Sequence, residues 1–284
     1  RAGAPVGRIV AIHNRNHAAF HEEPVGFFGF FECEDRQETA DRLFERAATW
    51  LRERGLETMR GPTSFSTNEE CGLLIEGFDR PPVVMMPYNP PYYERLIDGA
   101  GFTKAKDLVA LHLKLPEIPD YLLKREQRLA DRLDVRLRYI DMDDFEVELD
   151  RVRRIYNAAW EKNWGFVPMT EAEIAFMAEE LKPLLKSDPE QVVIAEDAGG
   201  EPIGFALWLK DFNQALKHAD GRLLPFGLIK ILWHARKIDM ARVLTLGLVP
   251  EYRQTGTDNL LYLRIIRAAH ALSLIHISEP TRPY

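Results

Sequence analysis

The sequence predicts an α/β protein built from two lobes, each with a mixed β-sheet. Short apolar runs typical of strands alternate with longer segments in which apolar residues recur every three or four positions, as in amphipathic helices. This order occurs twice along 284 residues, a length that fits one large domain or two of ordinary size. With 46% hydrophobic residues, the chain can bury a sizeable core.

In the first lobe, glycines and an aromatic run mark the elements. Gly55 and Gly101 are helix stop signals, and the two glycines in the aromatic run Val25–Cys33 indicate close backbone approach or a bulge. His13 and His17 stand four apart without an accompanying metal-site glutamate, so we expect surface or hydrogen-bonding histidines. The expected elements are a strand from Gly7, strands Val25–Cys33, Glu57–Gly61 and Leu108–Leu115, and helices Glu38–Gly55 and Asn89–Gly101.

A charged link, Pro116–Arg132, leads to the second lobe, where the periodicity is cleaner. The expected elements are a strand at Val135–Ile140, helices Phe145–Trp160 and Glu171–Leu185, a hairpin of Gln191–Glu196 and Pro202–Leu209 around Asp197–Gly200, a strand Val243–Val249 and a helix from about Thr257. An insertion, Asp211–Asp239, contains the apolar run Leu223–Trp233. We expect this run to cover a cleft or to pack between the lobes.

The segment Val243–Ile265 carries the clearest functional signal. Its apolar strand ends at Pro250, and a turn then opens directly into a helix. Gly256 lets the backbone approach a ligand, and the first N–H groups of the helix have no internal partner and attract anions. The turn therefore indicates a diphosphate cradle. The alternative is an ordinary strand, turn and helix capped by Asp258.

The turn resembles motif A of the GNAT superfamily of acyl-CoA N-acyltransferases, in which R/Q-x-x-G-x-G/A follows a strand. Arg253 and Gly256 match this motif, whereas Asp258 stands where the family has glycine or alanine. A carboxylate about 4 Å from a phosphate is repelled by about 4 kcal/mol at an effective dielectric near 20. Asp258 is therefore expected either to turn away as a cap or to weaken cofactor binding.

The first lobe carries a second resemblance. Asn89–Gly101 with Phe102, which reads NPPYYERLIDGAGF, resembles GNAT motif B, a helix that packs beside the cofactor. The turn after Glu32, CEDRQETAD, is acidic and lacks glycine, so we expect this lobe to support the fold or bind substrate. The whole order resembles a bacterial group of tandem GNAT-like proteins, the YghO-like group.

The resemblance implies two tandem acyl-CoA N-acyltransferase lobes, both incomplete. The expected division is a partial lobe over residues 1–115, a charged linker over 116–134, a second lobe over 135–272 that stops after motif A, and a tail over 273–284. The tail, SLIHISEPTRPY, resembles a translated adapter at the end of a metagenomic reading frame. We expect it to be poorly packed, because Pro280 and Pro283 prevent a helix and no alternation supports a strand. The chain opens on Arg1, so its native N-terminus is expected to be missing.

The resemblance also implies acetyl-CoA as cosubstrate, without a metal, and an amine acceptor that is a small molecule or a peptide. An N–H of Leu248 or Val249 would polarise the thioester carbonyl. Glu196 and Glu251 are candidate bases, although each also fits a solvated surface charge, and no catalytic tyrosine is assigned. The residues expected to bind the cofactor are Leu248, Val249, Arg253, Gln254, Thr255, Gly256, Thr257 and Asp258.

The loop Trp160–Met169 has two interpretations. Such a loop overlies the acceptor site in GNAT proteins, but Trp160, Trp164 and Phe166 also fit core anchors, because large aromatic side chains mostly serve packing.

Composition narrows the function classes. A net charge of −7 with scattered basic residues argues against a nucleic-acid surface, and no apolar run approaches the length of a membrane span. Two cysteines, Cys33 and Cys71, are too few for a disulfide framework, so a cytoplasmic location is expected. Three functions stay open at this point: a CoA-dependent N-acyltransferase, an aminoacyl or peptidyl transferase on the same scaffold, and a non-catalytic binding protein.

Overall fold

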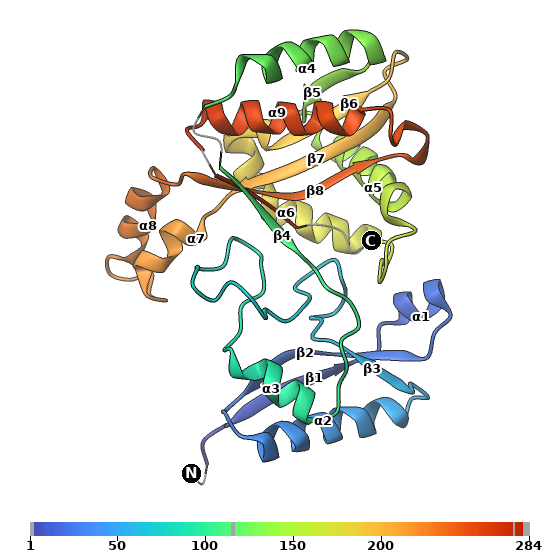
Figure 1. The fold of residues 1–284 in the computed structure, drawn as a ribbon, viewed down its shortest axis with the longest axis vertical. Helices are drawn as coiled ribbons and strands as arrows, with labels where there is room; N and C mark the ends of the chain where they lie inside the picture. The colour runs from blue at the N-terminus through green and yellow to red at the C-terminus, as the bar shows by residue number, and fades with distance from the viewer. Residues whose placement is uncertain (1–2, 115–116, 275, 281–284) are drawn as a thin grey trace. The chain divides into compact units, whose positions relative to one another are not determined.

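The structure is a computed structural model that describes residues 3–114, 117–274 and 276–280 (Figure 1). The chain divides into two compact units. Within the described residues, the first unit contains everything up to Leu108 together with Asn163–Pro168. The second contains Val109–Lys162 and the residues from Met169 onward.

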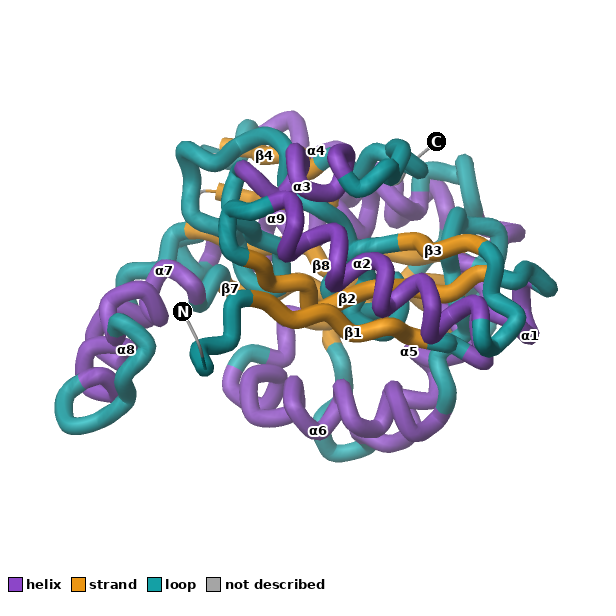
Figure 2. Tube along the Cα trace, turned by 90° about the horizontal axis from the view of Figure 1, so that it is seen from below, coloured by secondary structure: helices purple, strands orange, loops and turns teal. Residues whose placement is uncertain are grey.

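The first unit is a three-stranded mixed sheet with helices against it. The central strand β2 is antiparallel to β1 and parallel to β3. Figure 2 shows α2 running along these strands. The elements are β1 (Gly7–Ile12), α1 (Arg15–His21), β2 (Val25–Cys33), α2 (Gln37–Arg52), β3 (Thr58–Arg60) and α3 (Tyr92–Gly99).

The core of the first unit is aromatic. The Phe31 and Phe44 rings stack with centroids 4.8 Å apart, and Phe28 meets Phe44 edge-on at 5.1 Å. A Cβ on Gly26 would lie 2.4 Å from the Leu51 side chain, and one on Gly29 would lie 2.3 Å from the Thr63 carbonyl oxygen. The predicted close approach at both glycines is confirmed, and it explains why the aromatic strand contains them.

His17 does not fit its prediction as a surface or hydrogen-bonding residue. It is 1% exposed, and neither ring nitrogen has a hydrogen-bond partner among the described residues. The helix α1, capped by Asn14, presses the His17 ring against Phe27 and His21. Burial, with a smaller contribution from the charge of neighbouring His21, lowers the pKa of His17 to about 4.

The second unit is a six-stranded mixed sheet in the order β4-β9-β8-β7-β6-β5. Neighbouring strands are antiparallel except β8 and β9, which are parallel. Its elements are β4 (Ala110–Lys114), α4 (Asp120–Leu133), β5 (Arg136–Tyr139), α5 (Phe145–Trp160), α6 (Glu171–Ser187), β6 (Val192–Glu196), β7 (Pro202–Lys210), α7 (Asn213–Leu216), α8 (Gly227–Ala235), β8 (Met240–Leu248), α9 (Thr257–Ala271) and β9 (His276–Pro280), with short 3-10 turns at Pro189–Gln191, Lys217–Ala219 and Pro250–Tyr252.

Helices cover this sheet from two sides. α9 packs beside α4 and against β6, β7 and β8, whereas α5 contacts β7 and β8 and is joined by α6 (Figure 1). Alternate residues of β8 show that these are opposite faces: Gly247 meets Trp160 of α5, and Leu248 joins the core cluster that contains Leu260 and Leu261 of α9.

The expected strand Leu108–Leu115 forms as β4, but it pairs with β9 in the second sheet and not in the first. Most of the expected charged link Pro116–Arg132 forms the helix α4. Leu129 and Leu133 of this helix pack on the core of the second unit. Buried Glu126 of α4 pairs with Arg264 at 2.8 Å. Local pattern gives the strand but not its partner, which explains the first error.

The prediction of a poorly packed tail is wrong for the described part of residues 273–284. Residues 276–280 form β9 between β4 and β8, with Leu274 and Ile277 buried. Pro280 ends the strand, where the missing N–H costs least. Residue 275 and residues 281–284, which include Pro283, lie outside the described residues.

The apolar run Leu223–Trp233 forms the end of a loop and most of α8, and most of its large side chains are exposed. Of the aromatic loop, Phe166 is buried and Trp160 packs on β8, as core anchors do, whereas Trp164 is 39% exposed.

Candidate functional site

The edge of β8 that faces β9 is only partly occupied. β8 pairs with β7 from Ala241 to Leu248, but with β9 only from Met240 to Arg242. Beyond Arg242, the described strands add no further pair on this side. The predicted site residues lie toward this end of β8.

One backbone donor points toward this edge. The N–H of Val249 donates to the Ile203 carbonyl at 2.9 Å, so it is already used within the sheet. Because consecutive residues of a strand direct their N–H groups to opposite sides, the Leu248 N–H points away from β7. Of the two predicted polarising donors, the geometry selects Leu248.

Gly247 brings α5 close to the same strand end. A Cβ at this position would lie 2.3 Å from the Trp160 indole and 2.9 Å from the Ala159 Cβ. The indole also stacks on Tyr156, with centroids 4.6 Å apart. Trp160 thus forms an apolar wall beside the Leu248 N–H.

The turn after β8 has the backbone of an anion cradle. Gln254 and Gly256 both have positive φ, 61° and 101°, and Gly256 is the N-cap of α9. The Thr255 hydroxyl donates to the Tyr252 carbonyl at 2.8 Å and so braces the turn. Thr257 is fully buried and is the first residue of α9, a helix of 15 residues. The N-terminus of α9, with its partial positive charge, therefore lies at this turn.

The turn carries one positive and one negative side chain, Arg253 and Asp258. Arg253 donates to the Ala159 carbonyl at 2.5 Å, so its guanidinium ties the turn to α5. Asp258 lies in the first turn of α9 and is not the cap, because Gly256 holds that position. The expectation that Asp258 turns away as a cap is therefore wrong.

A second positively charged side chain, that of Arg132, lies close to Gly256, and the sequence did not suggest this proximity. The Arg132 Nη2 would be 3.7 Å from a Cβ on Gly256, and Leu129 of the same helix would be 3.8 Å away. Arg132 is exposed, so its guanidinium can reach an anion bound at the turn. Only the packing of α4 on α9 brings it there.

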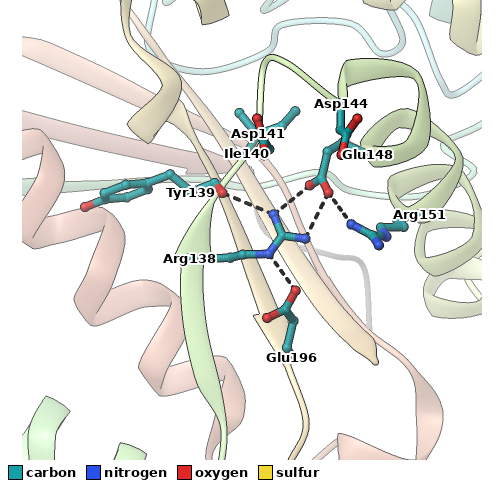
Figure 3. A pocket seen from close by; sticks show the side chains of 8 residues that line it. All are labelled: Arg138, Tyr139, Ile140, Asp141, Asp144, Glu148, Arg151 and Glu196. Atoms are coloured by element: carbon teal, nitrogen blue, oxygen red, sulfur yellow. Dashed lines mark hydrogen bonds and ion pairs between the residues drawn. The ribbon is translucent and has the colours of Figure 1, made fainter. Parts of the chain in front are cut away.

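Glu196, one of the two candidate bases, lines an open pocket of about 410 Å³ at the β5 edge (Figure 3). Its carboxylate accepts from Arg138 Nε at 2.5 Å. The same guanidinium binds both oxygens of Glu148, at 2.8 and 2.9 Å, and hydrogen bonding to Glu148 raises the pKa of Arg138. Glu148 is 1% exposed, so this is a buried ion-pair network.

The two candidate bases therefore differ. The expectation of a solvated surface charge is wrong for Glu196, which is buried and paired. It is confirmed for Glu251, which is exposed in the 3-10 turn after β8.

No protein-family model matches the chain. The chain is 34% identical to Protein YghO of Escherichia coli over 270 residues, which cover 94% of this chain and 68% of that protein. It is 33% identical to the bacterial ceramide synthase of Caulobacter vibrioides over 278 residues, 96% of this chain and 71% of that protein. The chain belongs to the YghO-like family.

Solved GNAT structures show the same fold. A GCN5-related N-acetyltransferase from Sphaerobacter thermophilus superposes with a TM-score of 0.50 at 10% identity, over 96% of this chain and 67% of that one. The glucosamine N-acetyltransferase region of a fungal multi-domain β-N-acetylglucosaminidase gives 0.51 at 12% identity, over 97% and 29%. These likenesses establish the GNAT fold.

The residues that resemble GNAT motif B have structural partners in the first unit. The Asn89 amide accepts from the Leu74 N–H at 2.7 Å and donates to the Leu74 carbonyl. The Tyr92 hydroxyl donates to the Cys33 carbonyl, and the Tyr93 hydroxyl accepts from the Cys33 N–H at 3.0 Å while donating to Glu32. In this GNAT chain, the motif B helix α3 therefore closes the end of β2.

Proposed function

We propose that the chain transfers an acyl group from an acyl-CoA thioester to an amine. The observation that carries this proposal is the end of β8. There the Leu248 N–H points away from β7, the described part of β9 no longer pairs with β8, and the turn Arg253–Asp258 leads into the N-terminus of α9. This arrangement offers one donor for a carbonyl and several for a diphosphate.

The residues of the turn fit the diphosphate of an acyl-CoA, with the exception of Asp258. Arg132 and the helix N-terminus favour a diphosphate, and Gly256 leaves the turn without a side chain. Asp258 opposes it through like charge. Its place in the first turn also favours α9 through the helix dipole, which gives a structural reason for the carboxylate.

In the proposed reaction the acyl-CoA supplies a thioester carbonyl. The Leu248 N–H donates to that oxygen and stabilises the negative charge that develops as the amine attacks. The Glu196 carboxylate is already bound to Arg138, which leaves exposed Glu251 or a chain of water to accept the amine proton. The indole of Trp160 would keep one side of the carbonyl dry.

The proposal also concerns the identity of the acyl group and of the amine acceptor. The motif implies acetyl-CoA and a small amine. The relative named bacterial ceramide synthase extends this to a fatty acyl group and a long-chain amine, because a ceramide is the amide of those two. We therefore propose donors from acetyl-CoA to fatty acyl-CoA, with the fatty acyl group favoured by that relative.

The proline variant Leu248→Pro tests this assignment. Proline removes the N–H that points away from β7 and leaves the bonds to β7 intact. The matched variant Leu248→Val keeps the N–H and trims the side chain. With a long-chain amine, release of free CoA thiol from acetyl-CoA and from palmitoyl-CoA should fall about 100-fold or more in Leu248→Pro and only slightly in Leu248→Val. Equal losses in two folded variants, or no release from either donor by the unmodified chain, would contradict the proposal.

A second function has a specific observation in its favour. Arg253 is already bound to the Ala159 carbonyl, and Asp258 places a negative charge in the first turn of α9. Both weaken the turn as a diphosphate site and favour a GNAT-fold binding protein without acyl transfer. A folded chain that neither binds acyl-CoA nor releases thiol would select this alternative.

A further inference from the structure

The insertion between β7 and β8 presents an apolar surface, which we call the α8 surface. It consists of the loop before α8 and the outer side of that helix. Its side chains are between 60% and 82% exposed: Leu223, Leu224, Phe226, Ile229, Leu232 and Trp233. They fall within eleven consecutive residues of the sequence, so the exposure is concentrated in one place.

The fold holds this surface outward. Ile231 and Ala235, on the inner side of α8, pack on the core of the second unit. Gly227 begins the helix so close to the Arg222 carbonyl that a Cβ would overlap it. Because residues one turn apart share a face, Ile229 and Trp233 lie together on the side away from that core. Figure 1 shows α8 beside α7, apart from the strands of this sheet.

The rim of the surface is basic in an acidic protein. Residues 216–237 contain five lysines and arginines against the single acid Asp220, whereas the whole chain carries −7. All five are exposed: Lys217, Arg222, Lys230, Arg236 and Lys237. The ammonium of Lys237 lies 5.6 Å from the centroid of the Trp233 ring, so a cation and an aromatic ring meet at the border of the apolar side chains.

We propose that the α8 surface docks on an anionic lipid surface. An apolar helix face with tryptophan, bordered by lysine and arginine, is the pattern of a helix that lies in the headgroup layer. A protein partner fits less well, since lysine is depleted in protein interfaces, whereas each lysine or arginine near anionic headgroups favours binding. None of the helices in the described residues has the length and apolar character of a membrane span. This inference does not depend on the proposed acyl transfer.

The chain offers a matched pair of phenylalanines for the test. Phe226 of the α8 surface is 66% exposed, and Phe176 of α6 is 67% exposed. Sedimentation with vesicles of phosphatidylcholine and phosphatidylglycerol should show binding by the unmodified chain and by Phe176→Ser. Binding should be about tenfold weaker or worse for Phe226→Ser, because a buried phenyl ring is lost.

A charge pair tests the rim in the same way. Lys230→Glu should weaken binding to these vesicles about tenfold, whereas exposed Lys186→Glu on α6 should leave it unchanged. Vesicles of phosphatidylcholine alone should bind the unmodified chain weakly. Tryptophan emission should shift to shorter wavelength on binding, and Trp233→Phe should remove most of that shift.

Three results would overturn the proposal. One is no binding to the anionic vesicles. Another is an equal loss in Phe226→Ser and Phe176→Ser, since the effect would then not belong to this surface. The third is a dimer in native mass measurements that Phe226→Ser dissociates, which would assign the surface to a second copy of the chain.

Discussion

The two units contain corresponding strands whose free edges meet different surroundings. β2 and β8 each have nine residues, and each pairs in parallel over its first three residues only, with β3 and β9 respectively. At their ends, the N–H of Glu34 donates to Val6 and that of Val249 donates to Ile203. Cys33 and Leu248 therefore direct equivalent N–H groups away from the neighbouring antiparallel strand.

The difference lies in what meets that donor. In the first unit, the Tyr93 hydroxyl accepts from Cys33 and the Thr63 N–H donates to the Phe28 carbonyl at 2.8 Å, so the chain itself fills the edge. In the second unit, no hydroxyl among the described residues is placed at the Leu248 N–H. A helix follows each strand, but the turns differ: Glu34 and Asp35 stand between β2 and α2, whereas the turn between β8 and α9 contains Gly256. The chain's own side chains thus fill one edge, whereas in our proposal the other edge receives a ligand.

The largest expected effect concerns Gly256. Its φ of 101° strains any branched residue, and a valine side chain would occupy the cradle, so Gly256→Val should weaken acetyl-CoA binding at least 100-fold, or about 3 kcal/mol. Gly101 of the first unit has a φ of 88° and open surroundings. Gly101→Val should carry similar strain without affecting affinity in calorimetry. Similar losses of affinity in both variants would break the comparison.

A stability effect should distinguish the filled edge from the open one. At Gly29 an added Cβ meets the Thr63 backbone at 2.3 Å, whereas at Gly256 the nearest atom is 3.7 Å away. Gly29→Ala should lower the free energy of unfolding by about 2–3 kcal/mol through overpacking. Gly256→Ala should lower it by about 1 kcal/mol through positive φ alone. Urea denaturation measures both, and equal costs would show that the first edge is not tightly filled.

Tyr93 provides a pH test of the filled edge. Burial raises the pKa of Tyr93 to about 12 in the folded chain, against a usual value of about 10. The folded state then holds the phenolic proton more tightly, so this contribution to stability is complete below about pH 10 and lost as the pH rises toward about 12. Tyr93→Phe should remove that pH dependence and cost about 1 kcal/mol at neutral pH. Denaturation at several pH values measures the free energy of unfolding. If its dependence on pH is the same in Tyr93→Phe as in the unmodified chain, the interpretation fails.

The smallest effects concern charge at the open edge. Arg132→Glu should weaken acetyl-CoA binding about tenfold, more at low salt, whereas Arg128→Glu on the same helix should change it little. Asp258→Ala should strengthen binding several-fold by removing repulsion. Calorimetry at two salt concentrations separates these outcomes. Equal effects of the two arginine changes would mean that Arg132 does not reach the ligand.

Local signals in the sequence predicted most of the second unit. The helix Phe145–Trp160 matches α5 at both ends, and Pro202–Leu209 differs from β7 by one residue, because periodicity and turn residues are local properties. The strand β9 and the helix α4 were missed for the opposite reason. Their stability depends on partners distant in the sequence, such as β4 for β9 and Arg264 for Glu126.

The candidate site divides in the same way. The sequence predicts the turn around Gly256 because the proline, the glycine and the helix that follow β8 are close together in the sequence. The nearness of Arg132 to Gly256, the Arg253 bond to Ala159 and the Arg138 network around Glu196 all join separate elements. No spacing in the sequence encodes them.

Hydrogen exchange with and without acetyl-CoA tests the central claim most directly, because it reports both edges in one sample. We predict protection of the amides of Leu248 and of the turn and first helical residues at 253–260, with no change at Cys33–Asp41. Protection at Cys33–Asp41, or exchange that acetyl-CoA leaves unchanged at both edges at saturating ligand, would contradict the account.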